Sequence, residues 1–208
     1  MRVPDTNDFL RRAGAKLHTT LWPESRAALR MPFQFDPPSP HEFAHFGAGT
    51  WVVPPATVFG ADLISLGEEV VVMEGVDMRA AAPLHLGDRC VFARFTSIWS
   101  SVGVHIGNDV MTSDYVTVVD CWHRPGNPTP GVRPPKGAPV VIGDGAYLGC
   151  SSIVGPGVTI GAGAFIGEGS VVLEDVPAHA VVYGNPARIT RQLSQTNDWQ
   201  GDMFGRTA

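Results

Sequence analysis

Branched aliphatic residues recur every six positions in the second half of the chain. From Ile142 to Pro177 the sequence divides without gaps into the words IGDGAY, LGCSSI, VGPGVT, IGAGAF, IGEGSV and VLEDVP. The first letter is always Ile, Leu or Val, the second is Gly in five of the six words, and the fifth is Ala, Ser or Val. This pattern predicts a parallel β-helix in which the first letter points inward and stacks on its counterpart one coil away. Three words form a coil, and neighbouring coils should lie about 4.8 Å apart.

The same pattern continues upstream with a longer coil. The words FGAG, LGEE, LGDR and IGND begin at Phe46, Leu66, Leu86 and Ile106, at intervals of 20 residues. The next coil begins at Ile142, after an interval of 36 residues. The additional segment is rich in Pro and Gly, so we expect residues 124–139 to leave the prism as an excursion loop.

Outside the repeat the pattern changes. Apolar residues at helical spacing between Phe9 and Leu17 predict an N-terminal helical segment within residues 1–45. Residues 46–191 should form the β-helix domain, and the polar residues 192–208 a C-terminal tail. The expected fold class is therefore all-β, a parallel β-helix with a short helical segment in front of it.

Composition supports this interpretation and narrows the possible functions. The chain contains 24 Gly and 18 Pro, and only 17% of its residues are charged, which is typical of short strands joined by tight corners. The net charge of −5 argues against a nucleic-acid partner. Three cysteines do not make a disulfide framework, so a reducing compartment is expected. With neither an apolar leader nor a run long enough to span a bilayer, we expect a soluble cytoplasmic protein without a membrane partner.

One word breaks the rule for the fifth letter. In VVDCWH the fifth place is taken by Trp122, whose indole is too large for an inward corner position. The coil should open there, with His123 at the rim where the excursion loop departs. A broken rule inside a regular repeat indicates a functional site. We therefore expect Trp122, with Arg124 and Arg133 of the loop, to shape an acceptor pocket.

The run from Pro139 to Arg191 resembles the hexapeptide-repeat acyltransferases, and most closely the galactoside, maltose and nodulation-factor O-acetyltransferases. The resemblance is carried by the repeat, by the ending DVP…GNPAR and by WVVPP at 51–55. It implies a left-handed β-helix, a homotrimer with active sites between subunits, and acetyl-CoA or another acyl-CoA as co-substrate.

The resemblance also implies roles for individual residues. The sequence DCWH matches a D-x-x-H pattern in which the His is the general base, here His123. Imidazole suits this role because its unperturbed pKa lies near 6.5. Asp120 either holds the imidazole tautomer or bonds the local backbone of a corner. The N–H of Cys150, after Gly149, would face the thioester oxygen. The thiols of Cys121 and Cys150 carry no motif of an activated nucleophile.

Further residues would bind the cofactor according to the same resemblance. Tyr147 stands where relatives carry a Trp near the CoA arm, and Glu168 lies one coil further on. Arg188 and Arg191 match basic residues near the CoA phosphates. Relatives usually have Lys or Arg at the position of Glu174, so this part of the CoA site is altered.

The expected function is therefore transfer of an acetyl group from acetyl-CoA to a hydroxyl of a sugar or small metabolite. An N-acetyltransferase acting on an amino sugar or an antibiotic is the alternative within the same class. His45, His85 and His105, which recur in one column of the coils with Ser65, raise a γ-carbonic anhydrase-like metalloprotein as another alternative. Those enzymes resemble a pattern of two His five residues apart, which this chain lacks, so no metal is expected. A non-catalytic trimeric scaffold is the remaining alternative.

Overall fold

The computed structural model describes residues 37–123 and 135–193. The chain divides into two compact units, and the described residues of the larger unit are 37–122 and 137–193. The smaller unit contains His123 and residues 135–136 among its described residues. The predicted N-terminal helix, residues 124–134 of the excursion loop and nearly all of the predicted C-terminal tail lie outside the described residues.

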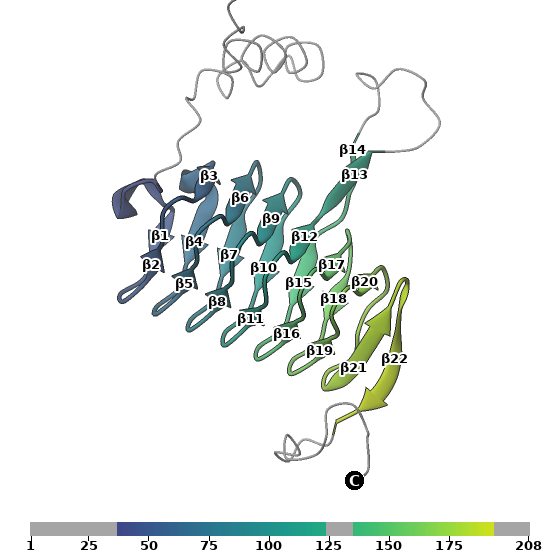
Figure 1. Cartoon of the computed structure of the whole chain (residues 1–208). Coiled ribbons are helices and arrows are strands. Elements are labelled where there is room, and N and C mark those ends of the chain that lie inside the picture. The colour runs from purple at the N-terminus through teal and green to yellow at the C-terminus, as the bar shows by residue number, and fades with distance from the viewer. Residues whose placement is uncertain (1–36, 124–134, 194–208) are drawn as a thin grey trace, which may run out of the picture. The chain divides into compact units, whose positions relative to one another are not determined.

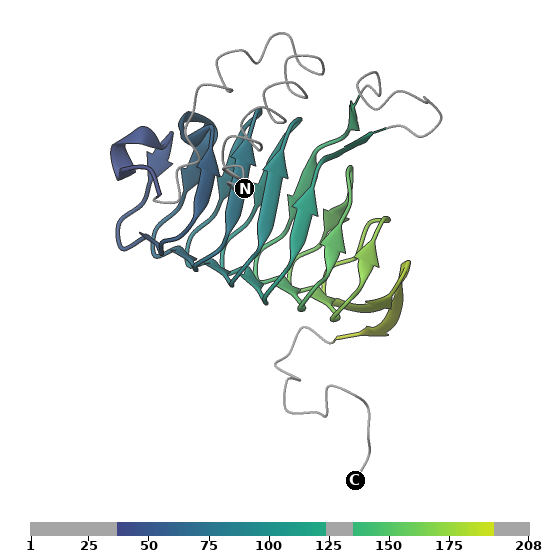
Figure 2. The same ribbon diagram turned by 45° about the horizontal axis from the view of Figure 1, so that its top comes forward.

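The larger unit is a parallel β-helix built from three sheets (Figures 1 and 2). Sheet A contains β1 (His45–Phe46), β4 (Ile64–Leu66), β7 (Leu84–Leu86), β10 (Val104–Ile106), β15 (Val140–Ile142) and β18 (Thr159–Ile160). Sheet B contains β2 (Trp51–Val52), β5 (Val71–Val72), β8 (Val91–Phe92), β11 (Met111–Thr112), β16 (Tyr147–Leu148), β19 (Phe165–Ile166), β21 (Ala180–Gly184) and β22 (Ala187–Gln192). Sheet C contains β3 (Thr57–Phe59), β6 (Asp77–Ala80), β9 (Ser97–Ser100), β12 (Thr117–Val119), β17 (Ile153–Val154) and β20 (Val171–Val172).

The register of the strands confirms the predicted coil lengths. Leu84 pairs with Val104, 20 residues on, and Val104 pairs with Val140, 36 residues on. After the excursion the interval falls to 18 residues, because Val141 pairs with Thr159. The spacing of the aliphatic letters therefore predicted both the coil and the position at which it is interrupted.

The core consists of the letters that the repeat assigned to the interior. The first letters Leu66, Leu86, Ile106, Ile142 and Ile160 are at most 1% exposed and stack in sheet A. The fifth letters of the six downstream words are all buried as well: Ala146, Ser152, Val158, Ala164, Ser170 and Val176. Burying a Leu or Ile side chain stabilises a fold by about 1.5–3 kcal/mol. The regular column of such residues thus holds successive coils together.

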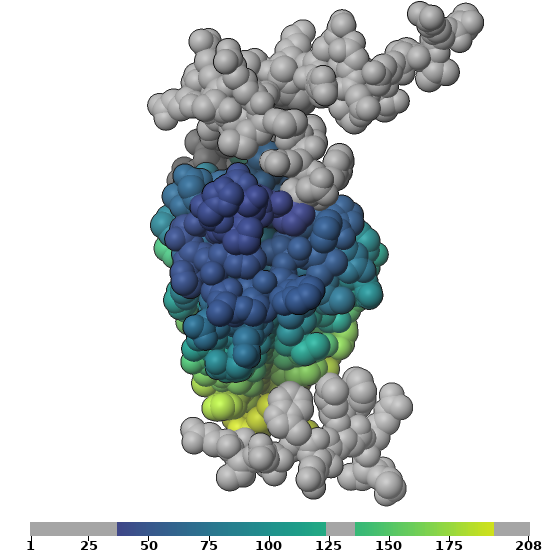
Figure 3. All heavy atoms as spheres, turned by 90° about the vertical axis from the view of Figure 1, so that its left-hand side faces the viewer, coloured from purple at the N-terminus to yellow at the C-terminus, as the bar shows by residue number. Residues whose placement is uncertain are grey.

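Each coil turns at three corners. The first corner joins sheet A to sheet B, the second joins sheet B to sheet C, and the third leads back to sheet A. In Figure 3 the first coils face the viewer, and later coils appear behind them in teal, green and yellow. The 3₁₀ turns η3 (Pro40–Glu42) and η4 (Ala61–Leu63) accompany the first coils, where the ring of Phe43 contacts that of Phe46.

At the other end of the stack the parallel pattern stops. β21 and β22 pair antiparallel around the sequence GNP, which closes the last coil with a hairpin. Just before the predicted excursion (124–139), β13 (Cys121–His123) pairs with β14 (Pro135–Gly137), which lies inside it, in a two-stranded sheet. In the part of the chain that the structure describes, no helix reaches the length and apolarity that a membrane span requires.

Candidate functional site

Asp120 is completely buried at the third corner, immediately before β13. Both of its carboxylate oxygens accept a hydrogen bond from the backbone N–H of Ser101, at 2.9 and 2.8 Å. One oxygen also accepts from the N–H groups of Val102 and Gly103, each at 2.7 Å. The sequence left two roles open for Asp120: holding the imidazole tautomer of His123 or bonding the backbone of a corner. The contacts seen here are those of the second role. Asp120 thus fixes the backbone of the preceding coil at the place where the next coil opens.

Trp122 points away from the core, as expected for an opened coil. Its side chain is 44% exposed. A Cβ added to Gly155 would lie 2.6 Å from the indole and 3.2 Å from Leu173, so the indole packs directly on the Gly155 backbone. Because Leu173 is itself 49% exposed, Trp122 forms an apolar surface at the third corner.

His123 is exposed at the end of β13. It belongs to the smaller unit, and the role of general base remains a prediction for it. Arg124 and Arg133, which the sequence assigned to the acceptor pocket, lie outside the described residues.

The second corner presents Cys150 with a free backbone donor. The neighbouring N–H groups are occupied: that of Gly149 donates to Ile166 O at 2.7 Å and that of Ser151 to Asp114 O at 3.0 Å. Within the described residues, the N–H of Cys150 donates no hydrogen bond. This is the donor that the resemblance assigned to the thioester oxygen, a role that stays a prediction.

Glycine at position 149 is required by the close approach of the next coil. A Cβ there would lie 2.7 Å from both Glu168 N and Ile166 O, which is too close for any side chain. Gly149 is itself buried, so its backbone packs against the next coil and fixes the corner beside Cys150.

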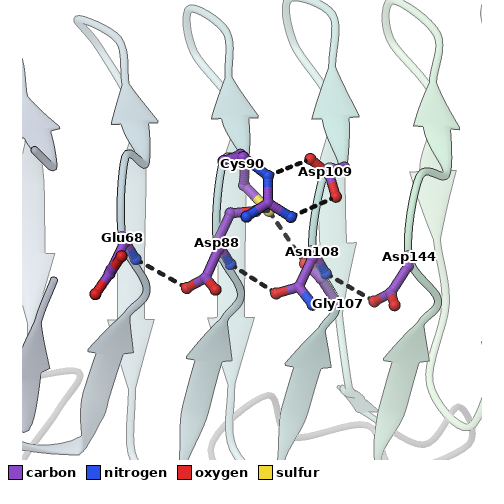
Figure 4. Close-up of polar contacts among 8 residues, drawn as sticks. Glu68, Asp88, Cys90, Gly107, Asn108, Asp109 and Asp144 are labelled. Atoms are coloured by element: carbon purple, nitrogen blue, oxygen red, sulfur yellow. Dashed lines mark hydrogen bonds and ion pairs between the residues drawn. The ribbon is translucent and has the colours of Figure 1, made fainter. Parts of the chain in front are cut away.

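At the first corner, side-chain oxygens accept hydrogen bonds from the corresponding backbone N–H groups (Figure 4). Asp88 Oδ1 accepts from the N–H of Glu68 at 2.9 Å, and Asn108 Oδ1 from that of Asp88 at 2.8 Å. Asp144 Oδ1 in turn accepts from the N–H of Asn108 at 2.8 Å. We call Glu68, Asp88, Asn108 and Asp144 the first corner column. Three successive N–H groups are thus capped by a side-chain oxygen of the following coil.

The equivalent residues of the second corner are Glu74, Arg94, Asp114, Cys150 and Glu168, which we call the second corner column. Here Asp114 Oδ1 accepts from the N–H of Arg94 at 3.0 Å. The capping then stops, because Cys150 has no side-chain oxygen and the Glu168 side chain accepts no bond from Cys150 within the described residues. The third letter of the repeat therefore decides which corner N–H groups stay open.

An aromatic row borders this corner on the outer face of sheet B. The rings of Tyr147 and Phe165 stack with centroids 4.8 Å apart, and the ring of Tyr183 lies 6.2 Å from that of Phe165. The structure thus brings Tyr147, Gly149, Cys150 and Glu168 of the predicted cofactor set to one corner region. The sequence analysis missed Phe165 and Tyr183. A signal for Tyr183 was available, because it replaces the glycine that recurs in this column at Gly149 and Gly167.

Arg188 and Arg191 lie apart from this corner in sequence, on the exposed strand β22. The guanidinium Nη1 of Arg188 is 3.6 Å from Glu174 Oε1, and both side chains are exposed. Exposed ion pairs contribute little to stability. The altered CoA site that the resemblance implies at Glu174 stays a prediction.

All three cysteines are free. Cys90 is buried in the core, and burial raises the pKa of its thiol to about 11. Cys121 and Cys150 are half-buried.

The predicted column of histidines is present in sheet A. His45 pairs with Ser65, Ser65 with His85 and His85 with His105. The imidazoles of His85 and His105 stack with centroids 4.7 Å apart. Partial burial and the neighbouring His105 lower the pKa of His85. Across residues 37–123 and 135–193, no group of three or more His, Cys, Asp or Glu side chains is placed to hold a metal ion.

Comparison with known protein families identifies the repeat. Residues 139–174 match the family model "Bacterial transferase hexapeptide (six repeats)". The resemblance to hexapeptide-repeat transferases is confirmed. The hexapeptide repeat thus covers the second corner, where Tyr147, Cys150 and Glu168 lie.

Curated proteins match part of the chain. The chain is 46% identical over 67 residues to a 2,3,4,5-tetrahydropyridine-2,6-dicarboxylate N-acetyltransferase of Staphylococcus carnosus, a match covering 32% of this chain and 28% of the relative. It is 40% identical over 72 residues to the protein of that name from Staphylococcus aureus, covering 35% and 30%. The matches span less than a third of the length of these relatives.

Solved structures share the β-helix over a longer stretch. AntD, an N-acyltransferase from Bacillus cereus in complex with dTDP and 3-hydroxybutyryl-CoA, superposes with a TM-score of 0.68 at 20% identity and covers 74% of this chain and 85% of its own. The hexapeptide-repeat acetyltransferase VCA0836 from Vibrio cholerae, complexed with acetyl-CoA, has a TM-score of 0.55 at 24% identity and covers 92% and 91%. PerB from Caulobacter crescentus, in complex with CoA and GDP-perosamine, has a TM-score of 0.53 at 26% identity and covers 70% and 59%. These likenesses support the hexapeptide-repeat fold.

Proposed function

We propose that the protein transfers an acyl group, acetyl in the simplest case, from a CoA thioester to an amino group of a small-molecule acceptor. The observation that carries this proposal is the open N–H of Cys150 at a corner of the segment that matches the hexapeptide transferases. A main-chain donor in this setting stabilises the charge that develops on a thioester oxygen during acyl transfer.

The sequence analysis expected a hydroxyl acceptor first and gave an amino acceptor as the alternative. The curated relatives are named N-acetyltransferases, and AntD is an N-acyltransferase. These names favour the alternative of N-transfer over the O-transfer that was expected first. Transfer to a hydroxyl remains the second candidate, supported by the ending GNPAR and by WVVPP, which resemble O-acetyltransferases.

In the proposed reaction, His123 accepts a proton from the attacking nitrogen as the new C–N bond forms. The N–H of Cys150 donates to the thioester oxygen while that oxygen gains charge. The C–S bond then breaks, and the CoA thiolate takes up the proton held by His123. No acyl-enzyme is required, because both substrates are held together. The proposal includes the homotrimer that the resemblance implies, with active sites between subunits.

An acceptor screen with acetyl-CoA, following release of the free thiol, tests this function. Amino sugars should be compared with their parent sugars, which differ by a single NH₂-to-OH exchange. Faster thiol release with the amine supports N-transfer, and faster release with the hydroxyl supports the second candidate. Failure of the protein to bind or hydrolyse acetyl-CoA would favour the scaffold alternative, and metal analysis of purified protein would reveal a metalloprotein.

The base is tested by His123→Ala, which should lower kcat by about 10²- to 10⁴-fold. His41→Ala provides the control, because His41 is an exposed residue of the η3 turn that carries no role in the proposed reaction. Near-full activity of His123→Ala would remove His123 from the mechanism.

A further inference from the structure

The outward-facing side chains of sheet B form an apolar column along the stack of coils, and none of them carries a formal charge. The strand register aligns Trp51, Val71, Val91, Met111, Tyr147, Phe165 and Val181, which we call the sheet B column. Trp51 is 69% exposed and Met111 is 49% exposed. At about 4.8 Å per coil, the column is roughly 29 Å long. A continuous apolar strip of this length on a protein surface indicates an interaction site.

The outer faces of the other two sheets have a different character. Sheet C presents Thr57, Asp77, Ser97, Thr117, Ile153 and Val171 in the corresponding column. Sheet A presents His45, Ser65, His85, His105, Val141 and Thr159, a column without a carboxylate, Lys or Arg. On sheet C the carboxylate of Asp77 pairs with the guanidinium of Arg79 at 2.8 Å. Covering sheet C would therefore desolvate an ion pair, whereas covering the columns of sheets A and B would not.

A second copy of this chain is the occupant that the proposed site requires. Trp122, expected to shape the acceptor pocket, lies at the third corner, and Cys150 lies at the second corner. The whole width of sheet C separates these two corners in one chain, because the chain passes from the second corner through sheet C to the third. Another copy has to bring its third corner to Cys150 if the two residues serve one reaction.

The order of the sheets limits how two copies can meet this requirement. Every coil runs through sheets A, B and C in the same order. When two copies lie side by side with parallel stacks, the two faces in contact run in opposite directions. Sheet B against sheet A then places the second corner of one copy beside the third corner of the other. Sheet B against sheet B pairs the second corner with the first, and sheet B against sheet C pairs it with another second corner.

Sheet C against sheet C also brings second and third corners together, but it covers the ion pair of Asp77 and Arg79. Sheet B against sheet A satisfies both conditions: it covers the apolar column, and it joins the two corners. Parallel stacks also keep the rows of about 4.8 Å aligned, so each coil of one copy can contact a coil of the other.

We propose that the outer face of sheet B docks on the outer face of sheet A of a second copy with the stacks parallel, so that Trp122 of one copy and Cys150 of the other border one site. The shared site rests on the proposed function, and the docking rests on the polarity of the faces. The contact is heterologous, because the two copies use different faces. Repeating it closes a ring, and the proposed homotrimer is such a ring.

Met111→Asp tests the docking, because it places a carboxylate in the middle of the sheet B column at an exposed position. We expect its mass by light scattering to fall from that of the oligomer to that of one chain. Val141→Asp, in the column of sheet A, should have the same effect. Thr117→Asp is the matched control: it adds the same charge at the same letter of the same coil as Met111, but on sheet C, and should leave the oligomer intact. Unchanged far-UV circular dichroism shows that each variant is folded.

A monomeric wild-type protein would overturn the docking, whatever else covers sheet B. An oligomer that survives both Met111→Asp and Val141→Asp would overturn it as well, because the copies would then meet through other faces. Dissociation of the control Thr117→Asp would place the contact on sheet C and contradict the proposal.

Mixed oligomers test the shared site. His123 follows Trp122 directly, so His123→Ala removes the proposed base next to the third corner. Glu168→Asn, designed to cap the N–H of Cys150, disables the second corner. Co-expression of these two weakly active variants should restore thiol release from acetyl-CoA, since some sites combine an intact third corner with an intact second corner. No restoration would show that both halves come from one chain. A wild-type oligomer that releases no thiol would instead overturn the proposed function and leave the docking to be decided by light scattering.

Discussion

The first and second corner columns have the same backbone and different chemistry. In the first, the side chains of Asp88, Asn108 and Asp144 each cap an N–H of the preceding coil. In the second, the capping ends after Asp114, and the N–H of Cys150 stays open within the described residues. The third letter of each word thus decides whether a corner N–H is capped by a side chain or stays open.

An open N–H alone does not mark a site. The first column also ends, because the coil after Asp144 has Ala162, which has no side-chain oxygen. What distinguishes the second corner is the combination of the open Cys150 N–H with the neighbouring aromatic row of Tyr147, Phe165 and Tyr183. The comparison therefore predicts that closed corners matter for stability and that the open corner matters for activity.

The largest effect on stability is expected at Asp120, whose side chain accepts hydrogen bonds from three backbone N–H groups of the third corner. Asp120→Ala leaves the N–H groups of Ser101, Val102 and Gly103 without their acceptor. Because the carboxylate of Asp120 is completely buried and a hydrogen bond to a charged group contributes about 1.5–3 kcal/mol, the free energy of unfolding should fall by about 3 kcal/mol or more. Urea unfolding of the purified variant measures this loss.

Asp120→Asn separates this role from that of orienting His123. The amide keeps one acceptor oxygen, so stability should be lost only in part. If Asp120 instead serves to hold the imidazole, Asp120→Asn should lose activity while its unfolding curve matches that of the wild type. An unchanged urea midpoint for Asp120→Ala would contradict the structural role altogether.

The next largest effect, on kcat, is expected when a side-chain oxygen is placed to accept from the N–H of Cys150. Glu168→Asn shortens the side chain to the length that caps the equivalent N–H in the first column, where Asp144 caps Asn108. The new amide oxygen should accept from the N–H of Cys150 and remove it from catalysis. We expect kcat to fall by about 10²-fold, the cost of losing one oxyanion donor, while the melting temperature stays level or rises.

Glu168→Gln is the control for this substitution. It removes the same charge but keeps the longer side chain, which leaves the N–H of Cys150 open in the wild type. Because Glu168 belongs to the predicted cofactor set, the KM for acetyl-CoA should change in both variants, whereas kcat should fall about 10²-fold only in Glu168→Asn. Equal loss of activity in the two variants would mean that the Glu168 charge matters, and that the open N–H does not.

The repeat made most of the fold predictable. The aliphatic first letters and small fifth letters fill the interior, so their period determines the coil length, and the register of 20, 36 and 18 residues followed from counting. The Trp122 break located the opened coil, because an indole cannot occupy a tight inward position. These features depend on local sequence and close packing, which a repeat records directly.

The candidate site was only partly predictable. The resemblance pointed to Cys150, but the open state of its N–H depends on what Glu168 does one coil away. The aromatic row depends on the Tyr183 ring, which rests on Gly167. Such contacts join residues that are distant in the sequence, so they emerge only when the coils are stacked.

The smallest effect on stability is expected when a capping side chain is removed from the first corner, away from the proposed site. Asn108→Ala removes the oxygen that caps the N–H of Asp88. This N–H is near solvent and can be rehydrated, so the free energy of unfolding should fall by only about 0.5–1.5 kcal/mol. Since Asn108 lies in the first corner column, kcat and the Kd for acetyl-CoA should match the wild type. A large loss of activity with intact stability would show that the first corner also takes part in binding, and the contrast between the two columns would then fail.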